Sequence, residues 1–223
     1  MKSLIDFILS LLRRQTPEQT TPVEPQAADP FPISDADLER CVLAAGADIN
    51  RAPVAAIAAA YKKAFIRYGV TDVLPIAFLL PQVAHESKNF TATREIWGPT
   101  PAQLRYEGNR NLGNTEPGDG RRFAGLFEIQ LTGRWNHTAY AKYRGLDVDD
   151  LPALADDRAT NADVALWYIT VNRKGFLAAA RRKDVLAASI AVNGANKDTG
   201  LPNGYEDRLA RTRAVLRVLG IPE

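Results

Sequence analysis

Seven segments of this 223-residue chain place apolar residues at helical spacing. They span residues 34–46, 52–69, 71–87, 133–144, 159–172, 175–193 and 204–219. Strand character is confined to 91–95 and 126–132, and the sequence has neither an internal repeat nor an alternation of strands and helices. A parallel sheet requires that alternation. The pattern therefore predicts a mainly α fold.

Composition divides the chain into three parts. Residues 1–14 form a short amphipathic segment that is too short to span a bilayer, which takes about 20 apolar residues. Two arginines stand where a signal peptide has small residues, so secretion through this segment is not expected. Residues 15–33 hold five of the 14 prolines and no Lys or Arg, as a linker does. We expect a folded domain over 34–223, and membrane or protein docking through 1–14.

The charge balance leaves two interpretations open. The net charge of +2 does not by itself call for nucleic acid, and no nucleic-acid partner is expected. Residues 173–217, however, include ten basic and four acidic residues. This excess favours an anionic partner such as a cell wall, while the alternative is a pair of solvated helix faces.

Elimination leaves carboxylate chemistry. The chain has two histidines, His85 and His137, and neither forms the paired-histidine helix motif of zinc peptidases. Serine-nucleophile and phosphate-binding loop motifs are also missing from the sequence. Cys41 is expected to fill a helix core. No metal and no cofactor are therefore expected.

Glu86 and Glu95 are the candidate catalytic pair. In one continuous helix, nine residues rise about 13 Å and place the two side chains on opposite faces. The sequence 89–94, NFTATR, is a poor continuation of a helix because of its β-branched threonines and its asparagine. A helix that ends near Asn89, followed by a chain that doubles back, would bring the two carboxylates together. Without that reversal, Glu86 is a salt-bridge residue and Glu95 is a solvated one.

Four segments in order resemble family 19 glycoside hydrolases. They are FLLPQVAHESKNFTATREIWGPT, LRYEGNRNLGNTEPGDGRRFAG, IQLTGRWNH and VNG. The resemblance runs from about residue 50 to 217. The family holds plant-type chitinases and phage endolysins, and the endolysin branch is the more similar. The resemblance implies a lysozyme-like helical domain with two lobes and a cleft, which cuts β-1,4 bonds between aminosugars with inversion.

The same resemblance implies roles for individual residues. Glu86 is the general acid and Glu95 the general base. Further positions match the family's substrate-binding and water-orienting residues: Gln130, Thr132, Asn136 and Asn193. Arg208 matches an arginine behind the acid, and Trp97 and Tyr106 are expected as cleft walls. Helix caps and internal hydrogen bonds are the alternative roles for the polar residues, and core packing is the alternative for the aromatic ones.

Two residues depart from the family pattern. Phe127 replaces a glycine, and its side chain would narrow the cleft. Glu128 replaces an apolar residue and adds a third carboxylate, which places the acid/base assignment in doubt.

The leading expectation is an endolysin-type muramidase that cleaves bacterial peptidoglycan. It would be made in the cytoplasm, released by a separate pore-forming protein, and would act on the cell wall. A chitinase of the same mechanism is the first alternative. A non-catalytic wall-binding protein, or an effector docked through residues 1–14, is the second.

Overall fold

The computed structural model describes residues 31–222. The predicted N-terminal helix at 1–14 and most of the predicted linker at 15–33 lie outside these residues. The compact unit begins at Phe31. The Phe31 side chain is buried and lies 6.0 Å from the Phe65 ring, centroid to centroid.

The first three described helices form one half of the core. They are α2 (Asp35–Ala44), α3 (Val54–Arg67) and α4 (Val73–Glu86). Ser34 caps α2 as expected, because its Oγ accepts a hydrogen bond of 3.1 Å from the Asp37 amide. Cys41 is fully buried on this helix, and burial raises the pKa of its thiol to about 12. The central helix α4 is buried along most of its length and contacts α2, α9, α10 and α11.

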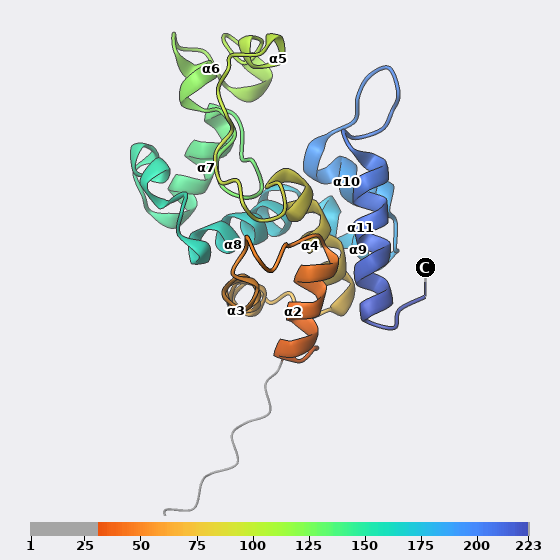
Figure 1. Cartoon of the computed structure of the whole chain (residues 1–223). Helices are drawn as coiled ribbons and strands as arrows, with labels where there is room; N and C mark the ends of the chain where they lie inside the picture. The colour runs from red at the N-terminus through yellow and green to blue at the C-terminus, as the bar shows by residue number, and fades with distance from the viewer. Residues whose placement is uncertain (1–30, 223) are drawn as a thin grey trace, which may run out of the picture. The chain divides into compact units, whose positions relative to one another are not determined.

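The C-terminal helices complete the core (Figure 1). They are α8 (Arg158–Trp167), α9 (Gly175–Arg181), α10 (Val185–Asn193) and α11 (Tyr205–Val218), and a π-helical turn, Tyr168–Asn172, follows α8. The prediction of a single helix over 175–193 is wrong, because the helix is interrupted between α9 and α10. Lys183 adopts a φ of 57°, and the Asp184 side chain caps α10 by accepting from the Ala187 amide at 2.9 Å. A good N-cap residue thus wins over continued apolar spacing.

The loop-rich middle of the sequence contains short helices that join α7 in a second lobe. These are α5 (Pro101–Leu104), η1 (Arg110–Leu112), α6 (Asp119–Arg122), α7 (Arg134–Arg144) and η2 (Val148–Leu154). Polar contacts support the part of this lobe around α6. The Glu107 carboxylate accepts from the Gly118 and Gly120 amides at 2.7 and 2.8 Å. Figure 1 shows α5 and α6 well apart from α10 and α11, with α4 between them.

The segments with strand character form two isolated antiparallel bridges, Arg94 with Leu126 and Leu126 with Leu131. The mainly α prediction is confirmed. Across residues 31–222, no helix has both the length and the apolar character that crossing a membrane requires.

Candidate active site

The chain turns directly after α4, which is one of the two alternatives that the sequence left open for the segment between the two glutamates. The helix ends at Glu86. Residues 88, 89 and 90 then adopt positive φ values of 49°, 66° and 61°. Non-glycine residues rarely occupy this region, and consecutive ones need support from their surroundings. Ser87 supplies part of it, because its buried Oγ accepts from the Phe90 amide at 2.8 Å. After this turn the chain reaches Glu95, whose amide donates to the Gly125 carbonyl at 2.8 Å.

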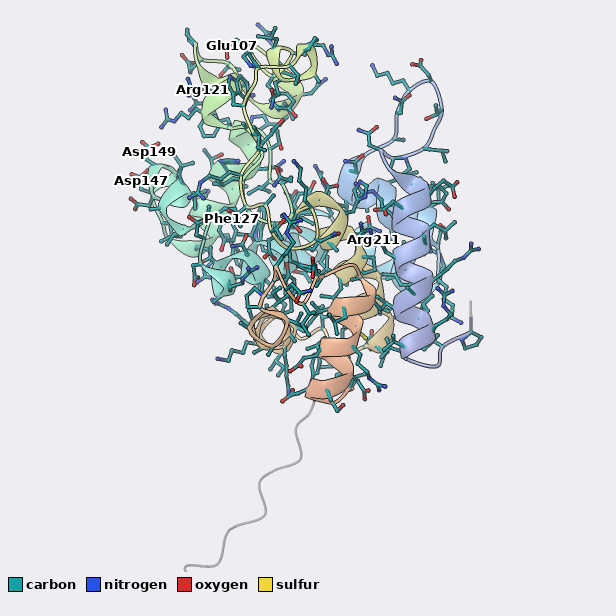
Figure 2. All side chains as sticks on the ribbon, in the orientation of Figure 1. Glu107, Arg121, Phe127, Asp147, Asp149 and Arg211 are labelled. Atoms are coloured by element: carbon teal, nitrogen blue, oxygen red, sulfur yellow. The ribbon has the colours of Figure 1, made fainter. Side chains whose placement is uncertain are left out.

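Side chains from distant helices hold the reversal. Arg211 on α11 donates from Nη1 to the Asn89 Oδ1 at 2.7 Å and to the Ala45 carbonyl at 2.7 Å. Phe90 is fully buried, with its ring 6.1 Å from that of Tyr61 in an edge-on arrangement. Figure 2 shows Arg211 reaching from α11 towards this region.

Glu86 forms an ion pair with a buried arginine, Arg208. Its Oε1 accepts from Arg208 Nη2 and, at 3.3 Å, from Asn193 Nδ2. Arg208 is fully buried and also donates to Gln82 Oε1 at 2.7 Å and to the Asn203 carbonyl at 2.9 Å. The contacts to Glu86 thus fall on one oxygen. Among residues 31–222, Oε2 has no hydrogen-bond partner and remains available to a ligand.

Glu95 is held by donors from a different part of the fold. Its Oε1 accepts from Gln103 Nε2 at 3.0 Å and from the Tyr106 hydroxyl at 3.4 Å. Its Oε2 accepts from the Gly125 amide at 2.9 Å, and its own amide donates to the Gly125 carbonyl at 2.8 Å. These contacts suit a carboxylate that acts as an acceptor.

The sequence interpretation did not single out Gln103. Its Nε2 also donates to the Ile96 carbonyl at 2.8 Å, and its Oε1 accepts from the amides of Gly98 and Thr100 at 3.2 and 2.7 Å. The local signal was present, because Thr100 followed three residues later by Gln103 is a capping box, with Pro101 in the first turn. One glutamine therefore caps α5 and fixes the Glu95 side chain.

A cavity of about 480 Å³ opens at Glu86. Four other predicted site residues line it: Gln130, Thr132, Asn136 and Asn193. Sequence reasoning did not identify Tyr168 and Arg173, which lie on its wall. The Arg173 guanidinium lies over the Tyr168 ring at 5.3 Å, and its Nε donates to the Tyr168 hydroxyl at 3.1 Å.

Gln130 connects the cavity to Glu95. It lines the cavity with Glu86, while its Oε1 lies beside Gly125: a Cβ there would come within 2.4 Å of Gln130 Oε1 and 3.2 Å of Glu95 Oε2. The glycine therefore permits this close approach. Tyr106 reports the same proximity, because its pKa is raised first by burial, then by Glu95, and in smaller part by the charge of Glu86. Both glutamates thus lie near Gln130.

Three polar residues of the cavity form a connected chain. Thr132 Oγ1 donates to the Gln130 carbonyl at 2.9 Å, and Asn136 Nδ2 donates to the Thr132 carbonyl at 2.8 Å. Asn172 Nδ2 donates in turn to Asn136 Oδ1 at 2.9 Å. These three residues therefore line the cavity and also make hydrogen bonds within the domain.

Four predicted site residues, including Glu95, lie outside the cavity lining. Trp97 and Tyr106 pair with each other, with ring centroids 6.4 Å apart, and adjoin Glu95 rather than the cavity at Glu86. Arg208 lies behind Glu86.

The two departures from the family pattern do not enter the cavity. Phe127 is fully buried, with its ring 6.0 Å from that of Tyr140, and Figure 2 shows it inside the body. The expectation that it narrows the cleft is therefore wrong, because the side chain packs in the core and does not line the cavity. Glu128 is also fully buried, and burial raises its pKa to about 7 despite its contacts with Arg158 and Tyr61. It is not a third carboxylate of the site.

Many basic residues of 173–217 are committed to contacts within the domain. Arg181, Arg208 and Arg211 form ion pairs with Asp72, Glu86 and Asp207. The sequence count of ten against four therefore overstates the positive charge available to an anionic polymer. No group of three or more His, Cys, Asp or Glu residues within 31–222 could hold a metal ion.

No protein-family model matches the chain, but solved chitinase structures have a similar fold. A glutamate-to-glutamine mutant of chitinase C gives a TM-score of 0.66 at 18% identity, over 88% of this chain and 97% of that one. Chitinase C from Streptomyces griseus HUT6037 gives 0.62 at 18% identity, over 89% and 82%. A bacterial family 19 chitinase gives 0.59 at 19% identity, over 86% and 97%. The chain therefore has the fold of these chitinases, which confirms the predicted lysozyme-like architecture.

Proposed function

We propose that this chain is a glycoside hydrolase of the family 19 type, which cleaves β-1,4 bonds between aminosugars with Glu86 as general acid and Glu95 as general base. One observation carries the proposal. Two carboxylates from opposite ends of one turn are held by separate sets of donors, and Gln130, which lines the cavity with Glu86, lies near Glu95. Catalysis by two carboxyl groups needs this arrangement, whereas a binding protein has no chemical use for it.

The proposed reaction follows from the free positions around the two carboxyl groups. Protonated Glu86 donates from Oε2 to the glycosidic oxygen as the bond to the anomeric carbon breaks. Glu95 takes a proton from a water molecule whose oxygen attacks that carbon from the opposite face. The product then has inverted configuration. Gln130, Thr132 and Asn136 bind the sugar or orient the water, and Asn193 holds both Glu86 and substrate.

We propose bacterial peptidoglycan as the substrate, on the basis of the resemblance to endolysins in residues 78–100 and 104–125. Arg173 supports this choice, because a cation on the cavity wall suits a polymer that carries carboxylates. The three similar structures are of chitinases, so chitin is the competing substrate.

Reducing-end release from purified peptidoglycan and from soluble chitin oligomers tests the proposal, with the anomer of the first product recorded by NMR. We expect cleavage of peptidoglycan and a first product whose anomeric configuration is inverted relative to the substrate. Cleavage of chitin alone would move the assignment to chitinase, and a retained anomer would contradict the two roles.

Two alternatives concern activity and location. A wall-binding protein without activity would bind peptidoglycan but release no reducing ends. Docking through residues 1–14, with action in the periplasm after release by a pore-forming protein, is part of the proposal. A chain that lacks residues 1–30 tests docking, because it should keep its activity on isolated walls and lose association with a membrane or a partner.

A further inference from the structure

Glu128 is a core carboxylate that the proposed reaction does not use. Its side chain is fully buried, and a buried carboxylate is costly unless it is paired and hydrogen-bonded. Its partners are therefore informative.

Three partners come from two helices. Arg158 Nη1 donates to Oε1 at 2.5 Å, and the Tyr61 hydroxyl donates to Oε2 at 2.9 Å. The Glu128 amide donates to Asn161 Oδ1 at 2.7 Å. Tyr61 belongs to α3, while Arg158 and Asn161 lie in the first turn of α8. The carboxylate thus ties a loop of the site to the rigid core.

The same partners reach the reversal between the two glutamates. Arg158 Nη1 also donates to the Phe90 carbonyl at 3.2 Å, and the Tyr61 ring packs on the Phe90 ring. Phe90 is the last of the three positive-φ residues that follow α4.

Glu128 also lies inside a second strained turn. Phe127 and Gln130 on either side of it have φ values of 64° and 53°, and the Gln130 amide donates to the Phe127 carbonyl at 3.0 Å. This turn places Gln130 on the cavity wall. Strained backbone of this kind persists when the surrounding structure holds it in place.

We propose that Glu128 and Arg158 form a positioning pair that holds both turns and thereby sets the placement of Glu86, Glu95 and Gln130. The inference rests on the proposed function for its kinetic consequence. Its structural content, that one ion pair holds two turns, stands separately and can be measured without substrate.

The test compares Glu128→Gln and Arg158→Met with a matched control. Asp163 is a buried carboxylate that likewise accepts from a tyrosine, Tyr140 at 2.8 Å, and pairs with Arg144. Its carboxylate contacts neither turn, but Tyr140 packs on Phe127, so Asp163 serves as a control for the turn after α4. Asp163→Asn therefore removes a similar buried charge elsewhere. All assays are run at pH 8 and at a temperature well below the melting temperature of each variant. Arg158 is 32% exposed, so Arg158→Met disrupts the pair from its solvent side should Glu128→Gln fail to fold.

We expect kcat of Glu128→Gln and Arg158→Met to fall by about 10- to 100-fold with KM within about twofold, because a small misplacement of catalytic groups acts on the chemical step. Arg158→Lys, which keeps the charge, should recover part of the loss. Asp163→Asn should lower the melting temperature but leave kcat within about twofold. Unchanged kcat in Glu128→Gln would overturn the proposal and leave the pair a purely structural contact.

Amide hydrogen exchange supplies the readout that needs no activity. We expect faster exchange of the Ala92 and Leu131 amides, which close hydrogen bonds within the two turns, in Glu128→Gln and Arg158→Met. The Ala92 amide should exchange at the wild-type rate in Asp163→Asn. Equal exchange in all variants would overturn the positioning role. An inactive wild type with this exchange pattern would refute the proposed function and leave the pair's role in place.

Discussion

At the scale of single residues, the site depends on side chains that hold the two glutamates. Arg208 and Gln103 are examples: each fixes one glutamate while satisfying further backbone or side-chain groups. Such rigid support is what a pair of catalytic groups requires, since rates fall steeply with small displacements.

Buried titratable residues predict how stability depends on pH. Burial raises the pKa of Glu128 from 4.5 to about 7, so between these values the folded chain keeps a proton that the unfolded chain has lost. The contribution of Glu128 to the free energy of unfolding is therefore complete below pH 4.5. Roughly 3 kcal/mol of it is lost as the pH rises from 4.5 to 7. Burial lowers the pKa of His137 from 6.5 to about 4, which acts in the opposite sense: stability is lost as the pH falls from 6.5.

The difference between wild type and Glu128→Gln isolates the Glu128 contribution, since His137 is common to both. We expect the wild-type advantage in the free energy of unfolding to fall by roughly 3 kcal/mol between pH 4.5 and 7.5. Urea titrations at several pH values measure it. A difference that does not change with pH would contradict the assignment.

The sequence pointed to Glu86, Glu95 and the polar residues of the cavity, because these follow one another in recognisable segments. It could not place Glu128, whose partners Tyr61 and Arg158 lie 67 and 30 positions away along the chain. It also missed Arg173, because an exposed basic residue carries no local signal of facing a cavity.

At the scale of elements, the reversal after α4 is the feature on which the site depends. The β-branched threonines and Asn89 indicated that the helix would end, and the end of the helix is at Glu86. The three consecutive positive-φ residues were not predictable, since contacts with α11, α3 and α8 compensate for their cost. The break between α9 and α10 was missed for a related reason: one capping aspartate outweighed helical spacing.

Lys88, the first residue of this run, is exposed and has a φ of 49°. Lys88→Val should destabilise the fold by about 1 to 3 kcal/mol, because a β-branched residue is strongly disfavoured at positive φ. Lys88→Gly should leave stability equal or slightly higher, since relief of strain offsets the added freedom of the unfolded chain. Thermal unfolding of the two variants side by side decides this. Equal destabilisation by valine and glycine would contradict the backbone geometry.

At the scale of the whole molecule, the fold brings together two lobes with different sources of stability. The helices around α4 carry most of the apolar core, to which α7 and η2 of the second lobe add Tyr140, Ala141 and Leu151. The part with α5 and α6 has polar contacts such as those of Glu107. Glu86 belongs to the first and Glu95 is held by Gln103 of the second. The sequence predicted the mainly α class and this two-lobed arrangement, but not the short helices of the second lobe, which are set by caps and polar contacts.

The most direct test of the central claim is the rate of glycosidic cleavage by Glu86→Gln and Glu95→Gln, with Glu206→Gln as a control at an exposed glutamate of α11. With the fold verified by circular dichroism, we expect each of the first two variants to lose about 10² or more in kcat, the scale of positioned acid/base groups. The control should keep the wild-type rate. If either Glu86→Gln or Glu95→Gln retains wild-type kcat on a substrate that the wild type cleaves, the two glutamates are not the catalytic pair.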